Sequence, residues 1–186
     1  MLDMAAKVGA GVDDTAVRAL LVSRAEEALR LATWMLHDRT AAEDAVQEAA
    51  LLAWDRRRSL RGPETADAWF NRILSNVCLA ELRRRARRPR IVELEVDRDP
   101  GADDGHEWDH GHQLLELRDE LGSAIRRLEP EEQVLLALRY GRDLTVPQVA
   151  AAMGLPEGTV KSRLHYSLAH LRAALDGERR AEEAVR

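Results

Sequence analysis

The sequence predicts an all-α protein made of two small helical domains joined by a flexible acidic linker. Three observations lead to this fold class. Apolar residues recur at helical spacing through residues 15–90 and 113–175, and the second of these stretches contains two helices around a tight glycine turn. Between them, residues 91–112 are strongly acidic and lack any such pattern. Residues 1–14 are expected to form a loose lead-in and residues 176–186 a short charged tail.

Composition and charge bound the class of protein. The chain has 186 residues, of which 45% are hydrophobic but only 4% aromatic, so its cores must rest on Leu, Ala and Val. No run of 18 apolar residues and no signal-peptide pattern occurs, and we therefore expect a soluble cytoplasmic protein. The one cysteine, Cys78, cannot form an internal disulfide and is expected to fill space in a helix. A net charge of −5 argues against tight DNA binding by the free chain, because phosphate neutralisation supplies most non-specific affinity.

The front domain is expected to hold three helices. The first begins near Thr15. The second begins at Thr40, which forms a capping-box pattern with Glu43, and it runs to about Arg57. The third begins near Glu64 after a basic loop and runs into a series of arginines. Its inward side is expected to consist of Ala66, Trp69, Phe70, Ile73, Val77 and Ala80.

Two outer faces of this domain carry charge. On the second helix, Asp44, Gln47 and Glu48 face solvent, although acids at a helix start also simply complement the helix dipole. On the third helix, polar and basic residues share one stripe, and its tail, residues 83–90, holds six arginines in eight positions. A charge run is usually a solvated face, but this density on an acidic chain favours contact with a polyanion.

The back domain contains the pattern of a helix-turn-helix. After helices that resume at Gln113, Thr145 and Gln148 form a second capping box and Gly154 supplies the left-handed residue that ends a helix. A further helix opens at Thr159. Its expected apolar stripe is Val160, Leu164, Leu168, Leu171 and Leu175, and its expected solvent side is Lys161, Ser162, His165, Tyr166, Ala169 and Arg172. The second helix of such a unit reads the major groove of DNA, but helical bundles use the same geometry, so the geometry alone leaves DNA binding open.

The linker offers one weak candidate for a metal site. His106, His110 and His112 lie close together in sequence, but no cysteine is near them and a fourth ligand is not evident. Zinc is therefore not favoured, and we expect no cofactor.

Two separate motif sets resemble one known family. Residues 157–165 are similar to the promoter-reading segment of bacterial sigma factors of the extracytoplasmic-function group. Residues 38–49, then Trp54, residues 68–73 and residues 82–85, resemble conserved region 2 of the same sigma factors. The two sets stand in the right order and together cover most of the chain.

The resemblance implies a protein that is not an enzyme but binds core RNA polymerase and directs it to promoters. The polymerase would then supply the DNA affinity that the acidic chain lacks. In such factors the front domain docks on the clamp helices of the polymerase, here through Asp44, Gln47 and Glu48, and the back domain meets the flap. The other implied partners are promoter DNA and an anti-sigma factor, with no membrane insertion and no small-molecule substrate. The acidic linker corresponds to a segment that family members thread through the polymerase.

The resemblance also assigns the DNA-reading residues. The front domain would read the −10 element as a melted strand with Arg61, Arg72, Asn76, Arg83, Arg84 and Arg85. The back domain would read the −35 element as duplex with Lys161, Ser162, Arg163, His165 and Tyr166. Trp69 points inward on the helical wheel and is expected in the core rather than stacked on a base.

The chain departs from the family pattern at Ala80, where an Asp is common, and at Tyr166, where a basic residue is common. These changes affect the expected promoter sequence. Two other functions are open on the residues alone: a helix-turn-helix regulator that binds DNA without polymerase, and a helical interaction protein. An enzyme is least supported, since no nucleophile with a base partner and no phosphate-binding glycine loop is evident.

Overall fold

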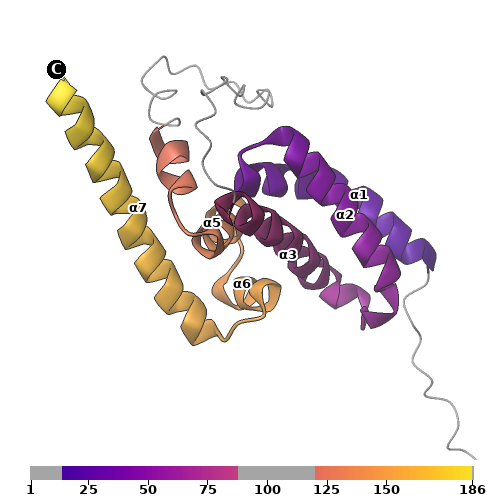
Figure 1. The fold of residues 1–186 in the computed structure, drawn as a ribbon. Helices are drawn as coiled ribbons and strands as arrows, with labels where there is room; N and C mark the ends of the chain where they lie inside the picture. Colours follow the sequence, from indigo (N-terminus) through magenta and orange to yellow (C-terminus); the bar gives the residue numbers. More distant parts are fainter. Residues whose placement is uncertain (1–13, 88–119, 186) are drawn as a thin grey trace, which may run out of the picture.

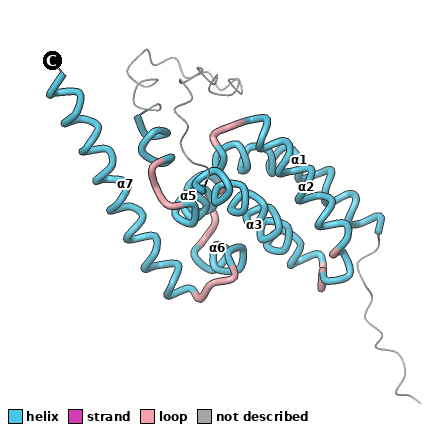
Figure 2. The backbone as a smooth tube through the Cα atoms, viewed as in Figure 1, coloured by secondary structure: helices cyan, strands magenta, loops and turns pink. Residues whose placement is uncertain are grey.

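The computed structural model describes residues 14–87 and 120–185, and within them all regular structure is helical (Figures 1 and 2). The predicted all-α fold class is thereby confirmed. The predicted linker, with its three histidines, lies outside the described residues. None of the described helices combines the length and the apolar character needed to cross a membrane.

The front half consists of three mutually packed helices, α1 (Asp14–Leu36), α2 (Arg39–Asp55) and α3 (Ala66–Arg87), with 3₁₀ turns η1 (Arg57–Ser59) and η2 (Pro63–Thr65) before α3. Figure 1 shows α1 and α2 side by side and α3 beneath them. The buried positions of α2 are all alanine, namely Ala42, Ala45, Ala49 and Ala53. These small side chains let α1 and α3 approach the backbone of α2 closely, so the core of this half needs few aromatic residues.

The turn between α1 and α2 corrects one prediction. The Asp38 Oδ1 atom accepts a hydrogen bond from the Ala41 backbone N at 3.1 Å, so Asp38 is the N-cap of α2. The predicted capping box of Thr40 and Glu43 is wrong, because the helix begins one residue before Thr40. Asp is as good a cap as Thr, and Asp38 has the extended backbone conformation that an N-cap requires.

The inward side of α3 also differs from the helical-wheel prediction. Ala80 is exposed, whereas Asn71 and Ser75 are buried. Trp69 is half-buried against the core, and its indole Nε1 donates to Ser59 Oγ at 3.0 Å. Cys78 is buried as expected, and burial raises the pKa of its thiol to about 12. A buried polar pair on a helix indicates that α3 packs on more than one side.

The back half contains helical residues 120–126, α5 (Pro130–Leu136), a π-helical turn η3 (Ala137–Gly141), α6 (Val146–Met153) and α7 (Glu157–Val185). The predicted capping box of Thr145 and Gln148 is confirmed, and Gly154 ends α6 in the left-handed conformation with φ 66°. One member of the predicted α7 stripe is wrong, since Leu168 is 42% exposed and Ser167 is buried in its place. The expected tail, residues 176–186, continues α7 as far as Val185.

The two halves share one hydrophobic core. Buried residues of α1, α2 and α3 form a single cluster with buried residues of α5, η3, α6 and α7. In this arrangement α3 packs against α5 and α6, and α1 packs against η3. The sequence left the relative orientation of the halves open, and the structure has them closed on each other (Figure 1).

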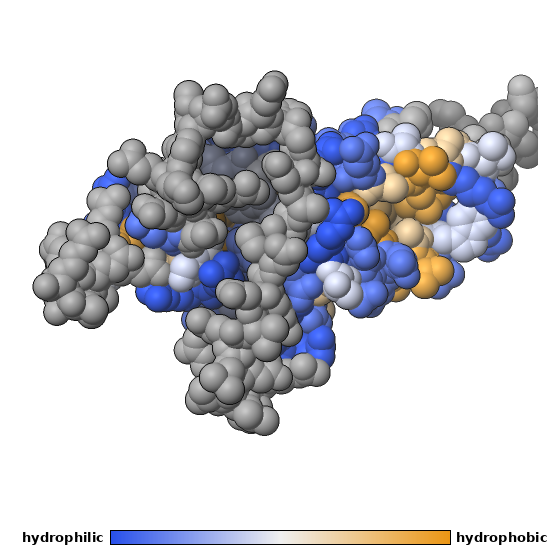
Figure 3. All heavy atoms as spheres, turned by 90° about the horizontal axis from the view of Figure 1, so that it is seen from above, coloured by the Kyte–Doolittle hydropathy of each residue, from blue (hydrophilic) through white to orange (hydrophobic). Residues whose placement is uncertain are grey.

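Apolar surface remains exposed on the front half. Val22 of α1 and Leu51 of α2 are 79% and 68% exposed. Figure 3 shows apolar residues gathered on the face formed by these helices, among hydrophilic neighbours.

His37 makes the stability of this fold depend on pH. Its backbone has φ 50°, its Nε2 atom is buried without a hydrogen-bond partner among the described residues, and burial, with Arg126 and Arg85, lowers its pKa to about 4. In the unfolded chain His37 is protonated below about pH 6.5, whereas in the folded chain it stays neutral down to about pH 4. We expect the wild type to lose up to about 3 kcal/mol of unfolding free energy, relative to His37→Asn, as the pH falls through this window.

Asn is the matched replacement because it does not titrate and tolerates positive φ. Urea unfolding of both chains at pH 7 and pH 4.5 measures the difference. If the unfolding free energy falls equally in the wild type and in His37→Asn, the pH dependence does not come from His37.

Candidate functional site

The residues predicted to read the −10 element lie mostly along α3. Arg61 is exposed in the loop between η1 and η2, and Arg72, Asn76, Arg83 and Arg84 are exposed on α3. Arg85 is partly buried. Positions 72, 76 and 83 are separated by four and seven residues, so these side chains project from one side of the helix.

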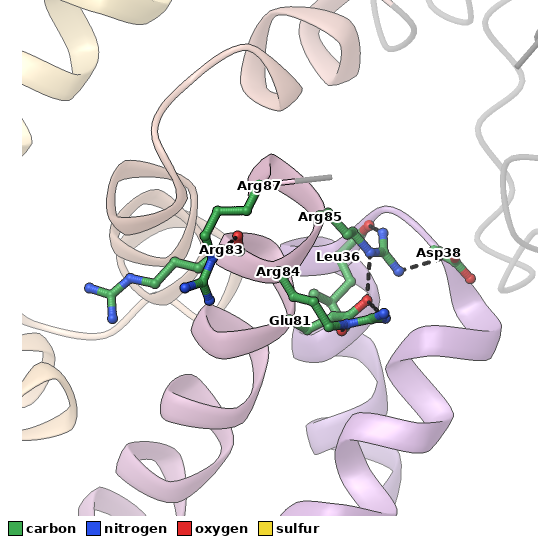
Figure 4. A network of polar contacts seen from close by, with 7 residues as sticks. All are labelled: Leu36, Asp38, Glu81, Arg83, Arg84, Arg85 and Arg87. Carbon is green, nitrogen blue, oxygen red and sulfur yellow. Dashed lines mark hydrogen bonds and ion pairs between the residues drawn. The ribbon is translucent and has the colours of Figure 1, made fainter. Parts of the chain in front are cut away.

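Arg84 and Arg85 at the end of α3 converge on one carboxylate (Figure 4). Glu81 accepts from Arg84 Nε at 2.6 Å and from Arg85 Nε at 2.8 Å. The hydrogen bonds from Arg84 and Arg85 outweigh the desolvation of Glu81 and lower the pKa of this carboxyl to about 2. Arg85 also donates to Leu36 O at 3.0 Å and to Asp38 Oδ2 at 3.2 Å. Arg85 thus ties α3 to the turn between α1 and α2, a structural role that the sequence did not indicate.

Arg83 points away from these two arginines, toward α5 (Figure 4). Its Nε donates to Glu131 Oε1 at 2.7 Å, and its Nη2 binds the same oxygen. A second predicted −10 residue also meets the back half. A Cβ atom added at Gly154 would lie 2.9 Å from Nη2 of Arg72, so the Arg72 guanidinium lies against the turn of the helix-turn-helix. The structure therefore brings the two predicted DNA-reading units into contact.

The residues predicted to bind polymerase lie on a different face. Asp44, Gln47 and Glu48 are all exposed on α2. Asp44 and Glu48 line an open groove between α2 and the end of α3, which Asp38 and Glu81 also line. The groove is also lined by Arg84 and Arg85, which pair with Glu81 and Asp38, so its net negative charge comes from Asp44 and Glu48. Such a surface complements a basic partner.

The predicted −35 residues lie on the first turns of α7. Lys161, Ser162, Arg163, His165 and Tyr166 are all exposed. Three buried residues, Val160, Leu164 and Ser167, hold the opposite side of α7 against the body of the protein. Ser162 Oγ donates to Gly158 O at 3.0 Å, and the rings of His165 and Tyr166 meet edge to face at 5.7 Å between centroids. The N-terminal part of α7 thus presents a polar, partly cationic face to solvent.

Several residues at the contact between the halves carry no local sequence signal. Arg142 of the loop after η3 forms an ion pair with Glu27 of α1, and the ring of Trp34 lies 3.1 Å from where a Cβ of Gly141 would stand. Glu131 lies in the first turn of α5, where an acidic residue is common in any helix. Its role toward Arg83 depends on tertiary packing.

Comparison with known proteins identifies the family. The family Sigma-70 region 2 matches residues 21–88, and the family Sigma-70, region 4 matches residues 124–173. The ECF RNA polymerase sigma factor SigL of Mycobacterium tuberculosis is 33% identical over 174 residues, which cover 92% of this chain and 96% of that protein. This chain belongs to the ECF RNA polymerase sigma factors. The RNA polymerase sigma-E factor of Streptomyces avermitilis is 30% identical over 154 residues, 83% of this chain and 82% of that protein.

Solved structures agree on the fold. CnrH in complex with the cytosolic domain of CnrY matches with a TM-score of 0.59 at 21% identity, covering 89% of this chain and 90% of that one. The sigma factor RpoE from Bartonella quintana, in complex with the anti-sigma factor NepR, matches with a TM-score of 0.56 at 24% identity, covering 87% and 95%. As an ECF sigma factor, this chain binds core RNA polymerase and directs promoter-specific initiation of transcription.

The turn of the sigma factor's helix-turn-helix is sensitive to substitution. Gly154→Ala is expected to lower the unfolding free energy by about 1–2 kcal/mol, because a Cβ is disfavoured at φ 66° and would also press on Arg72. Gly158→Ala is the matched control. Gly158 lies in α7 with open space around its Cβ position, and alanine there is expected to leave stability unchanged or raise it by up to about 1 kcal/mol. Urea unfolding measures the unfolding free energy of both variants. An equal change in Gly154→Ala and Gly158→Ala would refute the role of the left-handed turn.

Proposed function

We propose that this sigma factor is a non-enzymatic cytoplasmic protein whose three predicted surfaces act in turn. The face of Asp44, Gln47 and Glu48 docks on the clamp helices of core polymerase, α3 reads the −10 element and the start of α7 reads the −35 element. The front domain is taken as residues 15–90 and the back domain as residues 113–175. The observation that carries the proposal is that the docking face and the α7 face are both exposed, on opposite halves of one family-matched chain.

Charge supports the assignment of the docking face. Of the four carboxylates that line the groove between α2 and the end of α3, Asp38 and Glu81 pair with Arg84 and Arg85, so Asp44 and Glu48 supply its net negative charge. An acidic face repels DNA phosphates, so it suits a protein partner with basic residues. Gln47 adds an amide that can both donate and accept hydrogen bonds.

Side-chain chemistry supports the two DNA surfaces. Reading a melted strand requires cationic groups for phosphates and polar groups for base edges, and α3 offers Arg72, Asn76 and Arg83 on one side. Arg61 adds a cation in the loop before α3. Reading a duplex requires a helix that presents its N-terminal residues to the major groove. The exposed residues of α7 lie on its first three turns, directly after the Gly154 turn.

A protein partner that inhibits the sigma factor completes the proposal. Two solved structures with the same fold are complexes, one with the cytosolic domain of CnrY and the other with the anti-sigma factor NepR. We propose that an anti-sigma factor controls this chain as well, and the exposed apolar surface on α1 and α2 is available for such a contact.

Run-off transcription tests the proposal directly. Sigma-free core polymerase is given a genomic promoter library with and without this chain. We expect new transcripts that start at a fixed distance downstream of a shared two-part motif. Duplex binding by the chain alone, with no new transcripts in the presence of core, would instead indicate a helix-turn-helix regulator that acts without polymerase.

The docking face has a sharper test. Replacing Asp44 and Glu48 together with Lys is expected to weaken binding to core polymerase at least tenfold, about 1.4 kcal/mol, because the new cations face a basic partner. The control is Glu26→Lys together with Asp176→Lys, which makes the same charge change at exposed positions of α1 and α7, away from this face. Fluorescence titration of labelled chain with core measures both. Equal weakening in the two variants would trace the effect to net charge and overturn the assignment.

A further inference from the structure

We propose that Arg56 and Arg58, at the 3₁₀ turn between α2 and α3, are two further phosphate ligands for the −10 strand. A hydrogen bond between Trp69 and Ser59 holds them in position. Residues 56–61 are called the η1 segment below. The inference rests on the proposed function, because its ligand is the melted strand that Arg61 is assigned to read, and it names the groups that bind the backbone of that strand.

The η1 segment carries cations that no carboxylate of the described chain neutralises. It contains four arginines and no acidic residue in six positions. Arg56, Arg58 and Arg61 are exposed, and their side chains form no ion pair or hydrogen bond within the described residues. The side chain of Glu64, the next acidic residue along the chain, lies against Gly62 instead. An arginine without an internal partner can bind a phosphate without first losing a carboxylate.

The arginines at the end of α3 are in the opposite situation. Arg84 Nε donates to Glu81 Oε2 at 2.6 Å, and Arg85 donates to Glu81 at 2.8 Å and to Asp38 at 3.2 Å. Each of these two arginines must exchange a carboxylate for a phosphate when it binds DNA, which offsets part of the gain. The arginine run of α3 is prominent in the sequence, but the η1 segment has the cations that are free to bind.

Arg57 anchors the η1 segment to the front half. Its Nε atom donates to Asp14 Oδ1 at 2.6 Å, and its Nη1 atom donates to Trp54 O at 2.9 Å. Its guanidinium carbon lies 4.5 Å from the centre of the Trp54 ring. Arg57 is therefore occupied by the start of α1 and the end of α2, while Arg56 and Arg58 on either side of it remain exposed.

Two further contacts fix the backbone of the segment. Leu60 is 4% exposed and packs in a small apolar cluster with Val17 and Ala66. The Ser59 Oγ atom accepts a hydrogen bond from Trp69 Nε1 at 3.0 Å and donates one to the Arg56 carbonyl at 2.7 Å. The hydroxyl of Ser59 thus joins α3 to the backbone of Arg56. A backbone that is already fixed lowers the ordering cost when its side chains bind a ligand.

The chemistry of this segment suits the backbone of a single strand. A protein that holds a melted strand needs cations for successive phosphates in addition to groups that meet the bases. Contacts to phosphates fix the register of the strand, and groups at the base edges then read its sequence. Arg56 and Arg58 supply such cations in the same short segment as Arg61, directly before the helix that carries Asn76.

The test measures the salt dependence of strand binding in Arg56→Gln and Arg58→Gln. The probe is a labelled single-stranded oligonucleotide with the non-template −10 sequence of a promoter found by run-off transcription. Holoenzyme is titrated into it between about 50 and 200 mM salt. Each variant is expected to lower the slope of log affinity against log salt by about 0.7 and the affinity at about 0.1 M salt by about fivefold.

Arg172→Gln is the matched control, because it removes one positive charge from an exposed side chain of α7. Arg172 forms no ion pair or hydrogen bond within the part of the chain that the structure describes, and no DNA contact is assigned to it. This variant is expected to keep the slope of the wild type.

Ser59→Ala and Trp69→Phe test the positioning role without any change of charge. Each is expected to lower the affinity about threefold and to reduce the salt slope, because the arginines are still present but no longer held. The two losses are expected not to add in the double variant, since both substitutions remove the same hydrogen bond. Ser59→Thr keeps the hydroxyl and is expected to bind the strand as the wild type does.

The outcomes separate this inference from the proposed function. Slopes for Arg56→Gln and Arg58→Gln equal to that of Arg172→Gln would overturn the phosphate role. Wild-type slopes for Ser59→Ala and Trp69→Phe would overturn the positioning role. In either case, run-off transcripts from a two-part motif would leave the proposed function standing. A holoenzyme that binds the −10 oligonucleotide no better than a scrambled one would overturn both.

Discussion

The packing of α3 on both halves of the chain is the constraint on which the rest of the structure depends. One side of this helix, with Phe70 and Leu74, completes the core of the front half, and another side packs on α5 and α6. A helix buried on two sides has only a narrow strip left for solvent. That strip carries Arg72, Asn76 and Arg83, so the position of the back half decides how much of the strip is available to a ligand.

Charge pairing inside the chain explains how an acidic protein can carry an arginine-rich helix. Arg84 and Arg85 are bound by Glu81, Arg85 also reaches Asp38, and Arg83 is bound by Glu131. In the free chain these cations are thus largely matched, which agrees with a net charge of −5 and weak expected affinity for DNA. On α2, Asp44 and Glu48 remain exposed. The same pairing leaves the face proposed to dock on polymerase exposed.

Features that depend on residues close together in the sequence were predicted well. Contacts between residues far apart in the sequence were not predicted. The helices, the capping box at Thr145 and the left-handed Gly154 follow from residues within one or two turns of each other. Asp38 replaced Thr40 as a cap because both lie within reach of the same helix start. Ala80 and Leu168 were predicted on the buried side of their helices but are exposed. A helical wheel assumes that each helix buries one side along its whole length. α3 instead packs on two sides, and α7 is buried mainly near its start. The pairing of Glu131 with Arg83, 48 positions apart, has no periodic signature at all.

The packing of the two halves and the binding of a ligand to α3 are linked by thermodynamics. The Arg83 guanidinium is bound by Glu131 and the Arg72 guanidinium lies against the Gly154 turn, so a ligand that needs either group must replace these contacts. Any partner that binds only one arrangement of the halves stabilises it by as much as that arrangement improves the partner's own binding, and the effect is reciprocal.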